Sequence, residues 1–183
     1  MILPIRAYGD SILRKKCKTI TKDYPNLQQL IADMFETMDE SDGVGLAAPQ
    51  IGLDIRMFVI DSSLMHENEK DGIRKVFINA EMIDEYNDTW EFEEGCLSIP
   101  KIRENVARNG TIKLKFQDEN FKTHEEIFDG LTARVIQHEY DHIEGILFID
   151  HISALKRRLL KGKLADITAG KVSVNYRMKF PKK

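Results

Sequence analysis

The most constraining feature of the sequence is the stretch QHEYDH at residues 137–142, in which two histidines stand four residues apart. Residues four apart on a helix project from the same face, so His138 and His142 can hold one metal ion between them. Glu139, next to the first histidine, is placed to take a proton from a water molecule, which is how metal-assisted hydrolysis generates a nucleophile at neutral pH. The pattern therefore predicts a hydrolytic metal site on a helix.

Apolar residues extend the histidine stripe toward the N-terminus, because Val135 and Leu131 precede His138 at helical spacing. Asp129 suits the N-cap of this helix, and Gly145 suits its C-terminal stop. The spacing predicts a helix of about four turns with both imidazoles facing the core. An alternative is a pair of core histidines that hydrogen-bond to backbone carbonyl groups without any metal.

Composition and charge limit the class of protein. The chain has 183 residues, of which 42% are hydrophobic and 31% charged, so we expect a single domain over residues 1–183. No apolar stretch near the start is long enough for a signal peptide or a membrane span, and we expect a cytoplasmic protein without a membrane partner. The formal net charge of −3 argues against a DNA-binding protein. In a reducing compartment, Cys17 and Cys96 are expected to be free thiols or metal ligands.

Helix and strand patterns occupy different parts of the chain. Apolar residues recur at intervals of three and four between residues 25 and 40, which predicts an amphipathic helix. Strands are expected at residues 56–61, 76–78, 80–86, 90–92, 102–107, 111–117 and 123–128, with Asn109-Gly110 as a hairpin turn. This order indicates an α+β fold, with antiparallel sheets packed around a central metal-binding helix, an N-terminal helix and a C-terminal helix.

Two further segments interrupt the regular pattern. Residues 42–52, DGVGLAAPQIG, crowd small residues together, and their glycines allow the backbone to approach a ligand closely. Gln50 is suited to donate a hydrogen bond to a reacting carbonyl group. Residues 93–100, EEGCLSIP, are suited to present the Cys96 sulfur at the edge of a sheet. Taken alone, the first segment also fits an ordinary turn, and Cys96 also fits a small buried hydrophobic residue.

Together, GVGLAAPQ at 43–50, EGCLS at 94–98 and QHEYDH at 137–142 stand in the order of the three signature motifs of peptide deformylases, and the chain resembles that family from about residue 10 to 150. The resemblance implies a metal-dependent hydrolase that removes the formyl group from the N-terminal formylmethionine of newly synthesised polypeptides and releases formate. It implies Cys96, His138 and His142 as metal ligands, with Fe²⁺ in the cell and Zn²⁺ as a substitute. It also implies that Glu139 carries the proton, while the Gln50 side chain and the Leu97 backbone N–H stabilise the developing oxyanion.

The resemblance also suggests how a peptide is bound. Val44 and Gly45 would offer backbone hydrogen bonds to an extended peptide, and the methionine pocket would be lined by Phe92, Leu131 and Val135. Glu94 is expected to hold the Cys96 segment in place, paired with a cation such as Arg103. Arg134, a charged residue within the metal helix, departs from the family pattern. The detailed shape of the substrate pocket therefore does not follow from the resemblance.

The helix motif also allows two rival interpretations. A zinc peptidase would need a third ligand downstream, and the candidates Glu144, Asp150 and His151 lack the glycine pattern that such enzymes carry. A structural metal site in a binding module would gain nothing from a glutamate next to its ligand. Both interpretations are therefore weaker than the match to three motifs.

The C-terminal segment is strongly basic. Residues 153–183 contain ten Lys or Arg and one acid, Asp166, whereas the rest of the chain contains 17 Lys or Arg and 29 Asp or Glu. A helix is predicted here, with an apolar face made by Leu155, Leu159, Leu160 and Leu164 and a basic face opposite to it. One interpretation is a solvated helix that packs on the sheet. The other is a segment that docks on ribosomal RNA through phosphate contacts, where a deformylase would meet nascent chains.

Overall fold

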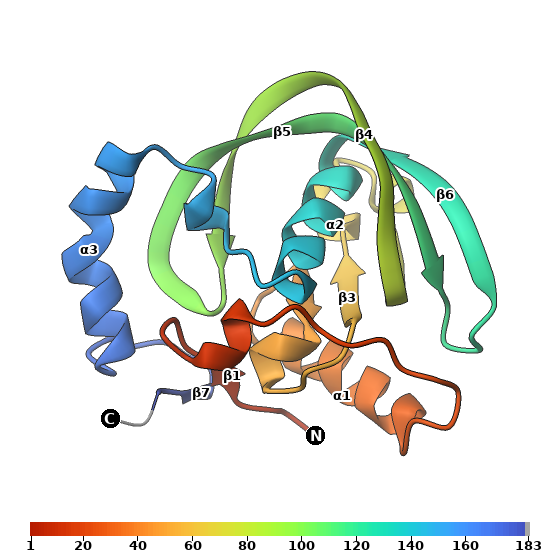
Figure 1. Ribbon diagram of the computed structural model, residues 1–183, viewed down its shortest axis with the longest axis horizontal. Coiled ribbons are helices and arrows are strands. Elements are labelled where there is room, and N and C mark those ends of the chain that lie inside the picture. Colours follow the sequence, from red (N-terminus) through yellow and green to blue (C-terminus); the bar gives the residue numbers. More distant parts are fainter. Residues whose placement is uncertain (182–183) are drawn as a thin grey trace.

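A curved five-stranded antiparallel sheet, in the order β2-β3-β4-β5-β6, forms the largest part of the fold (Figure 1). The structure is a computed structural model and describes residues 1–181. The strands of this sheet are β2 (Gly45–Ala47), β3 (Met57–Asp61), β4 (Arg74–Cys96), β5 (Ile99–Gln117) and β6 (Thr123–Asp129). The prediction of a mixed fold of helices and antiparallel sheet is confirmed.

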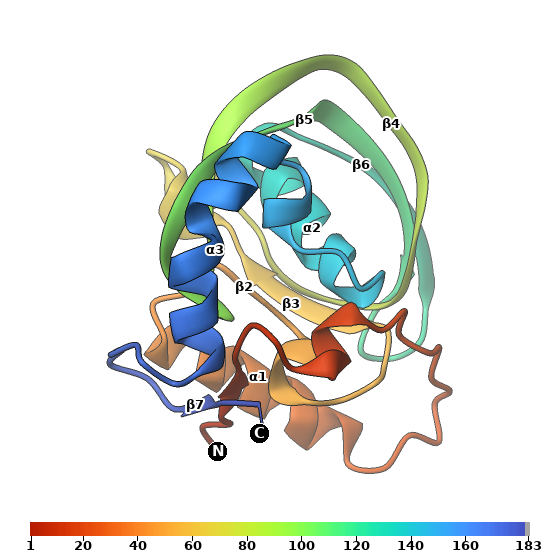
Figure 2. The ribbon, with the colours of Figure 1, turned by 60° about the vertical axis from the view of Figure 1, so that its left-hand side comes forward.

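A second, two-stranded sheet joins the two ends of the described chain. Strand β1 (Ile5–Arg6) pairs with β7 (Met178–Lys179) in parallel, so the expectation that every sheet is antiparallel is wrong here. A hairpin would make the strands antiparallel, but these two strands are separated by almost the whole chain and no such constraint applies. The N-terminal and C-terminal segments consequently lie side by side (Figure 2).

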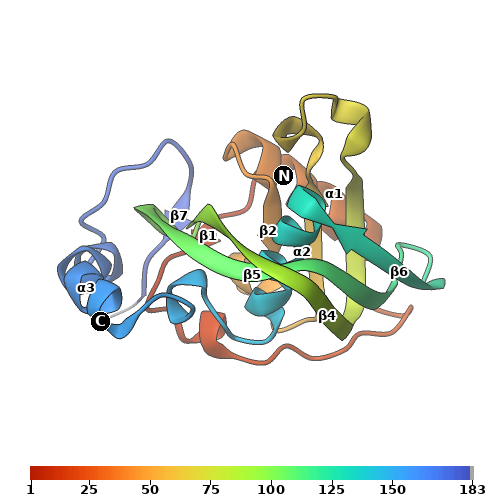
Figure 3. The ribbon, with the colours of Figure 1, turned by 90° about the horizontal axis from the view of Figure 1, so that it is seen from above.

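Three α-helices accompany the sheets: α1 (Leu27–Glu40), α2 (Gly130–Ile143) and α3 (Ala154–Thr168). Helix α2 lies in the concave side of the large sheet, where β4, β5 and β6 arch around it, and α3 lies at the outer side of the molecule (Figures 1 and 3). Short 3₁₀ helices connect the main elements: η1 (Ser11–Arg14), η2 (Ala48–Ile51), η3 (Ser63–Met65), η4 (Glu69–Asp71) and η5 (Phe148–Asp150). Among residues 1–181, none of the helices combines the length and the apolar character needed to cross a bilayer.

Strands β4 and β5 are each continuous, and the division into three and two shorter strands was wrong. The register between them shifts at four places before the turn, after Ile78, Met82, Tyr86 and Gly95. Each shift breaks the two-residue alternation that sequence analysis relies on, and it bends the strand. Asn109-Gly110 is no hairpin turn either, because Asn109 pairs with Thr89 in the middle of the ladder.

The tight turn between β4 and β5 falls instead at Leu97 and Ser98, because Cys96 and Ile99 are the last paired residues on either side. This turn lies within the EGCLS motif at residues 94–98. The long arched hairpin therefore ends in the segment that carries Cys96.

Helix α2 is held against the sheet by an apolar cluster that includes Ile136, Ile143, Phe58 and Phe77, all of them fully buried. The rings of Phe58 and Phe77 stack with their centroids 4.9 Å apart. Full burial of each such side chain stabilises a fold by about 1.5–3 kcal/mol. This cluster fixes the position of α2 relative to β3 and β4, and hence the position of its histidines.

The two ends of α2 are set by glycines in left-handed conformation. Asp129 occupies the N-cap position, as expected, but its side chain makes no capping hydrogen bond, and Gly130 (φ 56°) makes the turn into the helix. Gly145 (φ 75°) ends it, and a Cβ atom there would lie 2.6 Å from the Arg14 carbonyl oxygen. The predicted stop at Gly145 is confirmed, with both backbone conformation and close packing as its reasons.

The apolar face of α3 differs from the predicted one. Its buried residues are Leu160, Leu164 and Ile167, whereas Leu155 and Leu159 are 68% and 75% exposed. At about 100° per residue, the first three lie on one side of the helix and the other two about a quarter turn or more away. Two leucines thus remain in solvent on a basic helix.

Candidate metal centre

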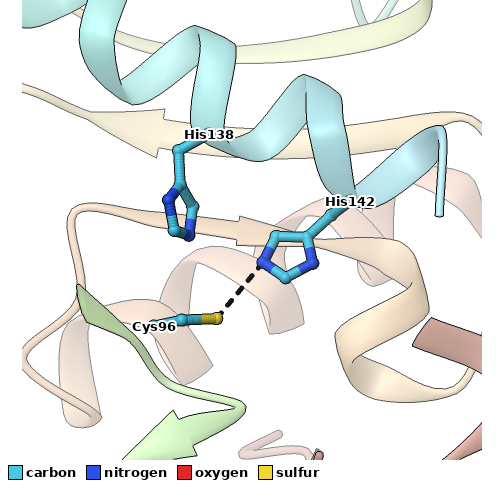
Figure 4. Close-up of side chains that lie close together, drawn as sticks. All are labelled: Cys96, His138 and His142. Atoms are coloured by element: carbon cyan, nitrogen blue, oxygen red, sulfur yellow. Dashed lines mark hydrogen bonds between the residues drawn. The ribbon is translucent and has the colours of Figure 1, made fainter. Parts of the chain in front are cut away.

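Three side chains with metal-binding atoms meet where the β4–β5 turn reaches α2. The ligand atoms of Cys96, His138 and His142 all lie within 4.8 Å of one another, and Cys96 Sγ lies 3.3 Å from His142 Nε2. Both imidazoles descend from one face of α2 toward the sulfur (Figure 4). The other cysteine, Cys17, is a buried free thiol. The structure therefore brings together the three residues that were expected to be ligands.

The charge state of Cys96 suits a ligand. Burial disfavours a thiolate, but the imidazoles of His142 and His138 outweigh that effect and lower the pKa of the Cys96 thiol to about 5. A thiolate at neutral pH is the form that binds a metal ion. Because the thiolate is the binding form, occupancy of this site by a divalent cation depends on pH.

Glu139 is buried beside these ligands, with 4% of its surface exposed. Its Oε2 atom has no hydrogen-bond partner within residues 1–181. Burial outweighs the nearby imidazoles and raises the pKa of the Glu139 carboxyl to about 7. A buried carboxyl that titrates near neutral pH is what general acid–base catalysis requires.

Gly45 makes room for this carboxylate. A Cβ atom at Gly45 would lie 2.4 Å from Glu139 Oε1, a distance that no side chain can adopt without displacing the acid. Gly45 therefore has a packing role in addition to the backbone hydrogen bonding expected of it.

Glu94 holds the ring of His138 in place by a hydrogen bond. His138 donates from Nδ1 to Glu94 Oε2 at 2.9 Å, which leaves its Nε2 for a metal ion. Arg108 donates from Nε and Nη2 to the two oxygens of the same carboxylate, at 2.7 and 3.0 Å. Burial opposes ionisation, but the hydrogen bonds from His138 and Arg108 outweigh it and hold the pKa of Glu94 well below its usual range. Such a partner fixes the orientation of a ligating imidazole.

The expected pairing of Glu94 with Arg103 is wrong. Arg103 bonds instead to Glu93, at 2.8 Å and with both side chains 60% exposed. Successive residues of a strand point to opposite faces, so Glu93 faces solvent when Glu94 faces the core. Arg108 was missed by the sequence analysis, although it follows the buried Val106 at the two-residue spacing of the core face.

Arg134 is buried and hydrogen-bonded to both strands next to the site. It is 2% exposed and donates to Glu94 Oε1 at 3.1 Å, to the Val106 carbonyl at 2.8 Å and to the Trp90 carbonyl at 2.6 Å. Its guanidinium group also lies over the Trp90 ring, 4.5 Å from the centroid. Arg134 thus ties α2 to both strands of the arched hairpin.

Gln50 and Leu97 are both neighbours of Cys96, Gln50 by a side-chain contact and Leu97 along the chain. Gln50, in η2, accepts a hydrogen bond from the Ala47 N–H through Oε1 at 2.8 Å, so its amide nitrogen points away toward Cys96 Sγ (3.5 Å) and Ser98 Oγ (3.3 Å). Leu97 follows Cys96 in the turn, and its carbonyl accepts a hydrogen bond from the Tyr176 hydroxyl. The Tyr176 contact could not be anticipated, because it joins residues 79 positions apart.

A cavity of about 650 Å³ opens beside these residues. Most of the residues that were expected to contact a substrate or take part in the reaction line this cavity, whereas Leu131 and His142 do not. Those that line it are Val44, Gly45, Gln50, Phe92, Cys96, Leu97, Val135, His138 and Glu139.

The residues fit a catalytic metal ion. A thiolate with two imidazoles is a donor set suited to zinc or ferrous iron, and three protein ligands leave a further position open, whereas structural sites use four. Two of the candidate third ligands of a zinc peptidase are engaged in other contacts. Glu144 pairs with Arg56 at 2.6 Å, and His151 pairs with Asp141 at 2.7 Å. The fold and this site define a metal-dependent hydrolase.

Comparison with known proteins identifies the family. Residues 2–158 match the family model of polypeptide deformylase. The peptide deformylase of Christiangramia forsetii is 54% identical over 190 residues, which cover 99% of this chain and 97% of that protein. The peptide deformylase of Cytophaga hutchinsonii is 53% identical over 181 residues, covering 99% and 98%. A crystal structure of a peptide deformylase from Legionella pneumophila is 38% identical, with a TM-score of 0.82 over 93% of this chain and 98% of that chain.

The chain belongs to the polypeptide deformylase family. It is a metal-dependent enzyme that removes the formyl group from the N-terminal methionine of polypeptides. The predictions of the family, the enzyme class and the reaction are confirmed.

Proposed function

We propose that α2 is the metal-binding helix at the centre of one domain over residues 1–183, with Cys96, His138 and His142 as the metal ligands and Glu139 as the catalytic acid–base. The observation that carries this proposal is the buried Glu139 carboxylate beside three convergent ligand atoms. Fe²⁺ is the proposed native ion, and Zn²⁺ is a substitute that the same donors accept. When bound, such an ion lowers the pKa of water and polarises a carbonyl group.

Glu139 is proposed to move one proton in each turnover. With a pKa raised to about 7, its carboxylate takes the proton from the water that attacks the formyl carbon. The same group then donates that proton to the departing amine of the methionine, and formate is released. One residue can perform both transfers because its pKa lies near the working pH.

Gln50 and Leu97 are proposed to stabilise the negative charge that develops on the formyl oxygen. The Gln50 side chain is held by the Ala47 N–H, so its amide group is oriented before the substrate arrives. The Leu97 N–H belongs to a two-residue turn between paired strands, which limits the conformations open to it. Loss of one such preorganised donor typically costs a factor of about 10²–10³ in kcat.

The substrate is proposed to bind as an added strand. Gly45 begins β2, which is the edge strand of the large sheet, and an edge presents unpaired backbone groups to an extended peptide. Val44 and Gly45 would make these bonds, and the methionine side chain would enter the cavity between Phe92 and Val135. Leu131, in the first turn of α2, does not line this cavity, so its proposed part in the pocket requires it to reach the methionine side chain when the peptide is bound.

The Glu139→Gln variant tests the assignment of the acid–base. We expect it to retain metal at close to the wild-type level and to lose nearly all release of formate from formyl-Met-Ala-Ser, because the amide cannot carry the proton. Glu125→Gln is a matched control, since Glu125 is an exposed acid on β6 that pairs with Lys113. Loss of metal from the Glu139 variant, or full activity in it, would contradict the assigned role.

We further propose a cytoplasmic enzyme that meets nascent chains at the ribosome through α3. Arg158, Lys161 and Lys163 are exposed and form no ion pair within residues 1–181, so their charge is available to phosphate groups. Lys156 is less suitable, because it pairs with Glu104 at 3.3 Å. The last two basic residues of the tail, at 182 and 183, lie outside the described residues.

Charge reversal on α3 tests ribosome docking. The triple change of Arg158, Lys161 and Lys163 to Glu should weaken co-sedimentation with ribosomes at low salt and leave hydrolysis of a short formyl-peptide unchanged. The same reversal of three exposed lysines elsewhere, Lys70, Lys115 and Lys122, controls for total charge. Undiminished ribosome binding by the α3 variant would defeat this proposal. Truncation at residue 170 is a poorer test, because it also removes Tyr176.

A further inference from the structure

We propose that Tyr176, in the C-terminal segment after α3, is a positioning residue for deformylation, because its hydroxyl group holds the turn that carries the Leu97 N–H. The inference rests on the proposed role of that N–H in stabilising the oxyanion. Tyr176 acts through Leu97 and is not proposed to touch the substrate.

The contact is direct and partly buried. The Tyr176 hydroxyl donates to the Leu97 carbonyl oxygen at 2.8 Å, and both side chains pack against the same core cluster, which contains Met38 and Leu46. Burial, with the charge of Cys96 as a smaller cause, raises the pKa of Tyr176. The hydroxyl group therefore keeps its proton and remains a donor at physiological pH.

The turn is held at adjacent points by other groups. The Tyr8 N–H donates to the Ser98 carbonyl at 2.8 Å, and the Gln50 amide lies 3.3 Å from Ser98 Oγ. These contacts secure Ser98, whereas Tyr176 secures the carbonyl of Leu97 itself. The Leu97 N–H and the Leu97 carbonyl lie on successive peptide planes joined at one Cα atom, so a hydrogen bond that holds the carbonyl restricts how far the N–H can turn away from the formyl oxygen.

Tyr176 is placed by the sheet that joins the chain ends. Strand β7 starts two residues after it, and the Ile5 N–H donates to the Arg177 carbonyl at 2.8 Å. The Ala7 N–H donates to the Lys179 carbonyl at 3.0 Å. The parallel pairing of β1 and β7 thus anchors a segment that lies beyond residue 158, where the match to the family model ends. Figure 2 shows this return of the C-terminal segment along the N-terminal strand.

A positioning role predicts a specific kinetic pattern. The Leu97 N–H is proposed to matter most when charge develops on the oxygen, so misalignment should lower kcat and leave KM nearly unchanged. The loss of one uncharged hydrogen bond that orients a donor corresponds to a decrease in kcat of about fivefold to tenfold.

The test compares Tyr176→Phe with Tyr24→Phe in the zinc-loaded full-length enzyme. Tyr24 packs against the same core cluster, and its hydroxyl makes no side-chain hydrogen bond among residues 1–181. Tyr24→Phe therefore removes a tyrosine hydroxyl group that has no hydrogen-bond partner. The measurements are kcat and KM for formyl-Met-Ala-Ser, zinc content, and hydrogen–deuterium exchange of the peptide that contains Leu97 and Ser98. For Tyr176→Phe we expect lower kcat, KM within about twofold, unchanged zinc and faster exchange in that peptide.

The remaining outcomes separate this inference from the proposed function. Unchanged exchange in the Leu97 peptide would overturn the inference, whatever the activity. Faster exchange with unchanged kcat would show that Tyr176 holds the turn but does not affect the reaction. That result would overturn the positioning role and would contradict the proposed role of the Leu97 N–H. A decrease in kcat that Tyr24→Phe matches would assign the effect to general packing and overturn the inference.

Discussion

Replacement of Arg108 by methionine should be among the most damaging single changes outside the ligands. Its side chain is 5% exposed and neutralises two acids, Glu94 through two hydrogen bonds and Asp141 at 2.8 Å. Methionine keeps much of the volume but leaves both carboxylates buried without their shared cation. Removal of one partner from a buried ion pair typically costs about 3–5 kcal/mol. For a chain of this length, that corresponds to a decrease of roughly 6–20 °C in Tm.

The pH dependence of this loss follows from the two acids. Burial opposes their ionisation, but hydrogen bonds from His138 to Glu94, from His151 to Asp141 and from Arg108 to both keep their pKa values lowered in the folded protein. A carboxyl group of this kind stabilises the fold above its unfolded pKa of about 4, and the stabilisation is lost as the pH falls through the lower folded value. The free-energy difference between wild type and variant should therefore be largest near pH 7 and should shrink below pH 4.

Arg103→Met is the matched control for this measurement. Arg103 lies on the same strand and pairs with the neighbouring glutamate, Glu93, but both side chains are 60% exposed. Its loss should change stability by no more than about 0.5 kcal/mol. Urea unfolding, followed by circular dichroism at one fixed zinc concentration, gives both values. If Arg108→Met costs no more than Arg103→Met at pH 7, the buried network is not what stabilises this region. Because Glu94 orients His138, the Arg108 variant should also bind zinc about 10–100-fold more weakly.

Three other changes probe the metal centre. Cys96→Ser should sharply lower the bound metal measured by elemental analysis, because an alkoxide is far harder to form than a thiolate at neutral pH; unchanged occupancy would mean that Cys96 is only packed there. Gly45→Ala should reduce kcat by about 100-fold or more while the protein remains folded, since the new Cβ atom displaces Glu139, and near-normal activity would refute that packing argument. In air, the iron form should lose activity faster than the zinc form, because zinc has no redox chemistry, and equal half-lives would argue against iron as the labile species.

Part of the candidate metal centre was predictable from the sequence, where the determining interactions are local. The spacing of His138 and His142 on α2 follows from the hydrogen-bonding pattern of a helix, which each residue makes with neighbours along the chain. The burial of Glu139 between apolar residues follows from the same period. The left-handed backbone conformation of Gly145, which ends that helix, is equally local. These features needed no knowledge of the rest of the fold, whereas the close packing of Gly145 against Arg14 is a tertiary contact.

The sheet could be predicted in class but not in detail. Its strands alternate well enough to indicate an antiparallel arrangement, yet bulges after Ile78, Met82 and Tyr86 shift the register between β4 and β5. Each shift changes which residues face each other, and the sequence alone does not show where these shifts occur or how many there are. The hairpin turn was predicted at Asn109-Gly110 because that dipeptide favours a tight turn, whereas the structure has it at Leu97 and Ser98.

Only the tertiary structure decided which side chains complete the site. Cys96 meets His142 across 46 positions, Glu94 meets Arg108 because of the register of a bent hairpin, and Tyr176 reaches Leu97 because β7 pairs with β1 at the far end of the chain. Each of these contacts depends on how the whole chain closes around α2. A helix is specified by interactions within a few residues, whereas contacts between distant segments are specified by the packing of the entire core.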